Sequence, residues 1–286
     1  MHLAHTHTFH RFITDDLCTG SIMPLTELMN YFNDQLQLQT RTQSLPATGF
    51  YKAGNTYGAR FGGLTFSSRF NPIEKRLGHS ELIGHDANLL VRAVTGREVS
   101  INDVFQSLDD KDQIIHLDRL TRTLHSLNYL QRYDNNALLS LTVQPRHIVS
   151  VSAEHGKTFE GILGDCGLGP ERVLLHTRLL NDQTLPHFRG AFLNYRARGY
   201  KIGIDILQPS DLLLLQQLNF DPDFILLHLL DSTSLATLDT HSLQWFQQGN
   251  PYPSRDVKRI LVGSETRLPD KIGLDRFDGF VRIPTA

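Results

Sequence analysis

The sequence is poor in cysteine. Its 286 residues include only Cys18 and Cys166, which lack CxxC spacing and are too few for a disulfide framework. Such scarcity is typical of proteins from a reducing compartment. We therefore expect a cytoplasmic protein.

Long apolar runs are also lacking. The longest, such as residues 212–215 and 224–230, are far shorter than the ~20 residues that a membrane helix needs. The N-terminus has His and Asp where a secretory signal has an apolar block. The sequence therefore predicts neither a membrane span nor secretion.

Neither sign of charge is in large excess. The chain has 28 Lys and Arg against 30 Asp and Glu, a formal net charge of -2 at pH 7. No cluster of Lys and Arg is dense enough to follow a phosphate backbone. Nucleic acid is therefore excluded as an expected ligand.

The first 59 residues differ from the rest and predict an N-terminal extension. A His/Thr-rich stretch opens the chain (His2, His5, His7 and His10), and we expect it to be a solvated tail. One amphipathic helix is predicted over residues 24–38. Residues 43–58 are rich in Gly, Ser, Thr and Asn and predict a linker or an exposed excursion. We place the domain boundary near Arg60, so that residues 60–286 form the main domain.

Within residues 60–286, β-favouring runs alternate with helical patterns, which favours a mostly parallel sheet with helices outside it. Helices are predicted over 112–132 and 187–198. Eight strands are predicted, over 63–73, 81–93, 137–143, 172–177, 201–207, 224–230, 259–263 and 279–283. This pattern predicts an α/β fold, a TIM-like (β/α)8 barrel. The first two strands should be antiparallel, since residues 74–80 are too few for a crossover helix.

Several short strings resemble motifs of the EAL family of cyclic-di-GMP phosphodiesterases, in the same order along about 225 residues. Residues 69–73 (RFNPI) resemble the family's FQPI strand, with Asn71 in place of Gln. Residues 84–92 (GHDANLLVR) resemble the family's G-x-E-A-L-L-R signature, stretched here by two residues. Residues 202–206 (IGIDI) resemble the strand that ends in DD, and 262–266 (VGSET) resemble EGVET. The family barrel also begins with an antiparallel pair of strands. The resemblance therefore implies an EAL-like barrel.

In that family, two divalent cations at the mouth of the barrel activate water for attack on a phosphodiester, which requires oxygen ligands and a general base. The resemblance implies that most of those groups are replaced here. The signature Glu becomes Asp86 or Asn88, according to where the strings are aligned. The other replaced positions are Thr142, His176, Ile206, Leu226 and Val262. We therefore expect no metal, no cofactor and no catalysis.

Some polar residues remain at the expected mouth. The candidate ligand-binding residues of this vestigial site are Arg92, Asn71, Asp86, Asn88, Asp205 and His176. Strand alternation puts Arg92 on the face of Asp86, where it either grips a phosphate or forms an internal ion pair with Asp86 or Asp205. A single His such as His176 is more often a hydrogen-bonded core residue than a metal ligand.

Three functions follow from this interpretation. The first is a catalytically inactive EAL-like regulatory module of bacterial signalling, which acts on an unidentified protein partner. The alternative is a receptor that binds cyclic-di-GMP without hydrolysing it. The third is residual cyclic-di-GMP phosphodiesterase activity. Binding of the nucleotide, with and without magnesium, separates the first two.

Overall fold

A computed structural model gives the fold of the chain, and it describes residues 24–42, 45–75, 81–133, 137–151, 167–229, 256–263 and 277–283. The N-terminal histidines and both cysteines lie outside these residues, so the predictions that concern them stay predictions. In the described part of the chain, no helix is long and apolar enough to cross a membrane.

Eight strands form a closed barrel. They are β3 (Leu64–Glu74), β4 (Leu82–Ala93), β6 (Leu138–Thr142), β7 (Val173–Thr177), β8 (Lys201–Ile206), β9 (Phe224–Leu229), β10 (Lys258–Gly263) and β11 (Gly279–Arg282). Their order around the barrel is β3-β11-β10-β9-β8-β7-β6-β4, and pairing of β3 with β4 closes the circle. The predicted TIM-like barrel is confirmed, and each of the eight predicted strands corresponds to one observed strand.

Strand β3 runs against the others. It is antiparallel to both β4 and β11, whereas β4, β6 and the strands from β7 to β11 pair in parallel. The link between β3 and β4 is too short to return the chain to the same end of the sheet, as predicted from the sequence. The antiparallel first pair is therefore confirmed.

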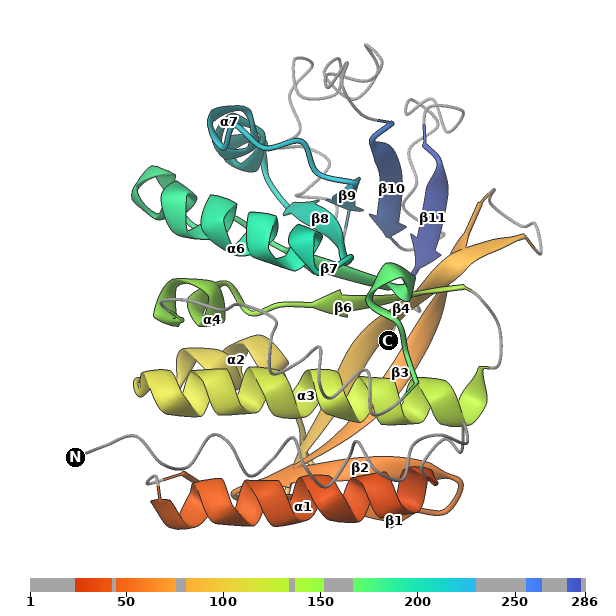
Figure 1. The fold of residues 1–286 in the computed structure, drawn as a ribbon, viewed down its shortest axis with the longest axis vertical. Helices are drawn as coiled ribbons and strands as arrows, with labels where there is room; N and C mark the ends of the chain where they lie inside the picture. Colours follow the sequence, from red (N-terminus) through yellow and green to blue (C-terminus); the bar gives the residue numbers. More distant parts are fainter. Residues whose placement is uncertain are drawn as a thin grey trace, which may run out of the picture.

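Helices cover the outside of the barrel (Figure 1). They are α2 (Ile101–Gln106), α3 (Lys111–Arg132), α4 (Pro145–Ser150), α6 (Leu185–Ala197) and α7 (Pro209–Gln217), with the short 3-10 helices η1 (Pro170–Arg172) and η2 (Asp182–Thr184). The Asp110 side chain caps α3 by accepting a hydrogen bond from the backbone N–H of Asp112. Because strands such as β7 are buried along their whole length, the apolar residues lie on both faces of the sheet.

Two apolar layers result from this arrangement. The interior of the barrel contains Ile73, Leu174, Leu226, Val262 and Val281, among others. A larger core lies between the strands and the outer helices, and includes both Ile204 and Ile206 of β8. Alternate residues of each strand therefore face either the barrel axis or the helices.

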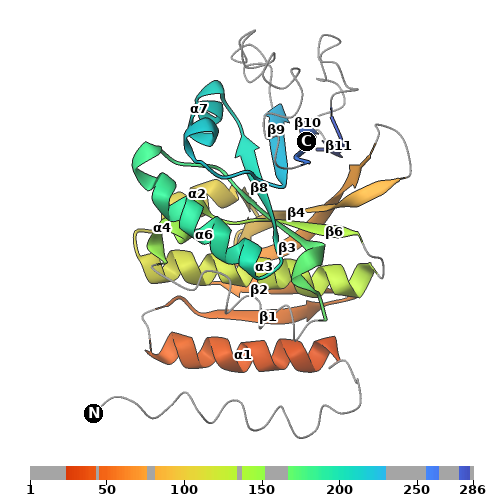
Figure 2. The same cartoon turned by 45° about the horizontal axis from the view of Figure 1, so that its top comes forward.

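The N-terminal part forms a layer of its own at one end of the molecule. Helix α1 (Leu25–Thr42) lies along a hairpin of β1 (Thr48–Ala53) and β2 (Thr56–Phe61), as both cartoons show (Figures 1 and 2). Strand β2 pairs antiparallel with β3, so the hairpin extends the barrel sheet. Of residues 43–58, predicted to be a linker or an exposed excursion, those from 48 on form β1, the start of β2 and a tight hairpin turn with Gly54 at a φ of 61°, so this part is not a linker. The boundary near Arg60 falls within β2, and the division into two domains stays a prediction.

Candidate functional site at the mouth of the barrel

Polar side chains gather at the carboxyl ends of the parallel barrel strands. They occupy the alternate strand positions that face the barrel axis, above the apolar interior. They are Asn71 of β3, Asp86 and Asn88 of β4, Ser140 and Thr142 of β6, His176 of β7, Asp205 of β8 and His228 of β9. Most of these are buried, and buried polar groups are usually hydrogen-bonded.

Asp205 joins two histidines. The Nδ1 atom of His176 lies 2.9 Å from each carboxylate oxygen of Asp205. The Nε2 atom of His228 lies 2.8 Å from Oδ1 of the same carboxylate. His176 and Asp205 are 4% and 5% exposed, so this pairing takes place almost out of contact with water.

Asp86 is the second carboxylate of the mouth. It accepts hydrogen bonds from the Ser140 hydroxyl at 2.9 Å and from the Asn88 amide at 2.8 Å. The Nε2 atom of His176 lies 3.5 Å from Asp86 Oδ1 and 3.3 Å from the Thr142 hydroxyl. The imidazole of His176 therefore lies between the carboxylates of Asp86 and Asp205.

The two carboxylates determine the charge of that imidazole. Burial alone would lower the pKa of His176, but the charges and hydrogen bonds of Asp205 and Asp86 outweigh burial and raise the pKa to about 10. Burial would raise the pKa of Asp205, but His176 and His228 hold it well below its usual range. At neutral pH the mouth thus contains an internal imidazolium paired with carboxylates.

The structure brings five of the six predicted site residues together. Asn71, Asp86, Asn88, His176 and Asp205 all lie at the mouth. Of these, Asp86 contacts His176, whereas Asn88 bonds to Asp86 itself. Asn71 is buried opposite Asp86 in the β3–β4 register, and its Nδ2 atom has no hydrogen-bond partner among the described residues.

Arg92 is the exception. It lies six residues beyond Asp86 on β4, about 20 Å along the strand at ~3.3 Å per residue. Its guanidinium pairs with Glu98 of β5 (Glu98–Val99) at 3.2 Å, and both side chains are largely exposed. The expected ion pair with Asp86 or Asp205 is wrong. Alternation assigned the correct face of the strand, but β4 continues past the mouth to pair with β5.

Ile206 is also displaced from its expected position. It follows the inward-facing Asp205, so it faces the outer helices and packs in the core between strands and helices. Leu226 and Val262 do lie in the barrel interior, as expected. Two of the three apolar replacements therefore face the barrel axis.

His228 is a site residue that the sequence analysis missed. It lies two residues after Leu226 on β9, so the same alternation predicts that it faces the axis. Its spacing from Leu226 is the signal that marks it, whereas the family resemblance assigns a position at the mouth to Leu226 and not to His228. A run of apolar residues around His228 also made the strand resemble plain core.

A cavity of about 170 Å³ adjoins the mouth between β4, α2 and α3. Asn88 and Thr142 line it on the side of the mouth, and His125 and Asp118 line it from α3. The Asp118 carboxylate is already bonded by the Arg122 guanidinium and by the backbone N–H of Gln144. Burial lowers the pKa of His125 to about 4, against a smaller opposing effect of Asp86, so this ring is neutral at physiological pH.

No protein-family model and no curated protein matches the sequence. Solved structures do match. The Xanthomonas citri FimX EAL domain in complex with cyclic-di-GMP has a TM-score of 0.55 at 15% identity, over 90% of this chain and 92% of that one. The Klebsiella pneumoniae BlrP1 complex with calcium and cyclic-di-GMP has a TM-score of 0.52 at 17% identity, over 76% of this chain.

This chain spans only 54% of the BlrP1 chain. A standalone EAL protein from Vibrio cholerae O395, in its cyclic-di-GMP-bound form, matches with a TM-score of 0.50 at 16% identity, over 70% of this chain and 81% of that one. At these identities the similarity shows a shared fold. The structural neighbours are EAL domains, so the chain has the barrel fold that the sequence resemblance implied.

Proposed function

We propose that this chain is a non-hydrolysing barrel of cyclic-di-GMP signalling that regulates a protein partner. The link to the nucleotide comes from the structural neighbours, which were determined in complex with it. The chemistry of the mouth supports the absence of hydrolysis. The observation that carries the proposal is the position of the His176 imidazole between Asp86 and Asp205.

The His176 imidazolium neutralises the carboxylates of Asp86 and Asp205, as a bound cation would otherwise do. Two carboxylates that face each other in a buried site need a positive charge between them. The His176 imidazolium supplies it, with Nδ1 at 2.9 Å from Asp205 and Nε2 on the side of Asp86. A divalent cation would therefore have to displace a charged ring that already has hydrogen-bond partners.

The rest of the donor set does not suit two divalent cations either. Magnesium and calcium prefer several hard oxygen ligands. Around the axis, Leu226 and Val262 offer only hydrocarbon, and Asp205 is shared by two histidines. Leaving a cation beside these apolar side chains costs several kcal/mol of lost hydration. The residues present do not fit the pair of metal ions that the resemblance implies.

A second candidate is a receptor that binds cyclic-di-GMP without cleaving it. The buried Asn71 amide favours it, because its Nδ2 atom has no partner among the described residues and lies at the mouth. Against it, the guanidinium of Arg92 pairs with Glu98 outside the mouth. Among the described residues, the mouth thus offers a ligand the polar amides of Asn71 and Asn88, whereas the His176 ring is already paired with carboxylates.

The test is an assay for conversion of cyclic-di-GMP to the linear dinucleotide in magnesium or manganese, with an active EAL domain as positive control. We expect no turnover. The variant His176→Glu, which restores a carboxylate where the resemblance implies a metal-binding Glu, should also be inactive because Leu226 and Val262 remain. Metal-dependent turnover by the parent protein refutes the proposal. Calorimetric titration with the nucleotide then separates the two candidates, and we expect no binding.

A further inference from the structure

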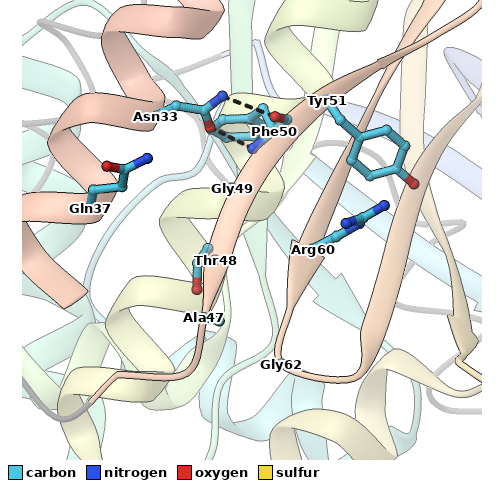
Figure 3. Close-up of a pocket in the computed structure, with 9 residues that line it drawn as sticks. All are labelled: Asn33, Gln37, Ala47, Thr48, Gly49, Phe50, Tyr51, Arg60 and Gly62. Carbon is cyan, nitrogen blue, oxygen red and sulfur yellow. Dashed lines mark hydrogen bonds between the residues drawn. The ribbon is translucent and has the colours of Figure 1, made fainter. Parts of the chain in front are cut away.

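A groove of about 480 Å³ lies far from the mouth, between helix α1 and the β1–β2 hairpin (Figure 3). Strand β1 is an edge of the eleven-stranded sheet, so one side of its backbone has no neighbouring strand among the described residues. Unpaired strand edges bind extended peptides readily, since their N–H and C=O groups point outward. The groove is therefore a place where backbone chemistry is exposed.

Helix α1 already covers part of that edge. The Ala47 carbonyl, just before β1, accepts a hydrogen bond from the backbone N–H of Gly62, just after β2, at 2.8 Å. The backbone N–H and C=O groups of the odd-numbered residues of β1 therefore point toward β2. The backbone N–H and C=O of Phe50 point away from β2. The N–H donates to the Asn33 side-chain oxygen at 2.7 Å, and the C=O accepts from the Asn33 side-chain nitrogen at 2.9 Å. By alternation the backbone N–H and C=O of Thr48 also point away from β2. Its backbone N–H has no partner among the described residues.

Gln37 lies one helical turn after Asn33, about 6 Å further along α1. Outward-facing residues of a strand repeat every ~6.6 Å, so Gln37 stands opposite Thr48 much as Asn33 stands opposite Phe50. The Gln37 side chain is exposed and has no hydrogen-bond partner within the described part of the chain. Figure 3 shows the two side chains apart, with the groove between them. An amide group of a ligand therefore has both a donor and an acceptor available here.

The opposite wall of the groove carries a positive charge. The Arg60 guanidinium lies 5.0 Å from the centre of the Tyr51 ring, which itself lies over Gly58, where a Cβ would come within 2.4 Å of the ring. Gly49 separates the two walls without a side chain between them. None of the described residues that line the groove is acidic. The charge of the groove thus complements a carboxylate.

We propose that this groove binds the C-terminal end of an extended peptide from the partner protein. The peptide backbone pairs with Thr48 and with the Gln37 amide, and its terminal carboxylate crosses Gly49 to reach Arg60. This inference rests on the proposed function in one respect, because it specifies the chemistry of the partner. It does not depend on the mouth of the barrel.

The test is a screen of the purified full chain against two libraries of random hexapeptides, one with free C-terminal carboxylates and the other with C-terminal amides. We expect binders from the first library only. Arg60→Gln should weaken the best binder about tenfold or more, because it removes a charge-assisted contact. Thr48→Pro should abolish binding by removing the N–H, whereas Thr48→Val, which keeps it, should bind like the parent.

A matched control is Arg97→Gln, which removes an exposed arginine in the turn between β4 and β5 and should leave binding unchanged. Proline at position 48 is compatible with an edge strand whose N–H faces away from β2, and an unchanged circular dichroism spectrum checks this. No binder, equal binding of the amidated peptides, or full binding by Thr48→Pro would overturn the inference. Cyclic-di-GMP turnover would instead refute the proposed function and leave peptide binding at this groove intact.

Discussion

Replacing His176 with Leu tests whether the imidazolium holds the mouth together. The substitution keeps similar volume but removes the imidazole that lies between the buried carboxylates of Asp86 and Asp205. Breaking a buried charge pair by removing one partner costs about 3–5 kcal/mol. We therefore expect the free energy of unfolding in urea to fall by that amount at neutral pH.

The pH dependence of the same variant gives a sharper test. The pKa of His176 is 6.5 in an unfolded chain and about 10 in the folded protein, so folding takes up a proton between these values. The stabilisation by this ring is complete below pH 6.5 and is lost as the pH rises through about 10. As the pH rises from 6.5 to about 10, the free energy of unfolding of the parent should therefore fall relative to that of His176→Leu. The depressed pKa of Asp205 acts in the acid range, outside the window.

The double variant His176→Leu/Asp205→Leu provides the control. Replacing both members of a buried pair by apolar residues is often neutral, so the double variant should be more stable than the two single effects predict. Urea denaturation at several pH values measures the parent, His176→Leu, Asp205→Leu and the double variant. A loss below about 1 kcal/mol for His176→Leu, or equal pH slopes for parent and variant, contradicts a charged His176.

Three further predictions concern residues around the site. Arg92→Ala should change stability by less than about 1 kcal/mol and leave any nucleotide binding unaltered in calorimetry, because its exposed pair with Glu98 lies outside the mouth. Gly203→Val should destabilise the fold in thermal unfolding by about 1–3 kcal/mol, since a Cβ there would come within 2.8 Å of the His176 Cβ. Asn128→Leu should lower the free energy of unfolding by about 1–3 kcal/mol and expose the N-terminal hairpin to proteases, because the Asn128 amide bonds the backbone N–H and C=O of Tyr57 in β2.

The alternation of β-favouring runs with helical patterns predicted the barrel. Runs such as 201–207 and 224–230 were long enough and bounded by clear helical patterns, so their strands were found to within one or two residues. The hairpin of β1 and β2 was missed because Gly and Asn dominate its turn, and a composition rich in turn residues also describes a linker. Its stability comes from pairing with β3 and contact with α1, which local sequence does not reveal.

The site was predicted less well than the fold. The family resemblance pointed to His176 and Asp205 and strand alternation to the face of Asp86, and the structure brings these three side chains together at the mouth. Parity does not state where along a strand the barrel ends, and for this reason Arg92 was wrongly placed at the mouth. Nor does sequence alone reveal that His176 and Asp205, which are 29 residues apart, form a buried charged pair.

The most direct test of the account is a nuclear magnetic resonance titration of the His176 side chain, followed through its ring nitrogen and carbon signals in the presence and absence of millimolar magnesium. The account predicts a ring that stays charged above pH 6.5, loses its proton near pH 10, and does not respond to magnesium. A ring that titrates near 6.5, or one that magnesium displaces from Asp86 and Asp205, contradicts it.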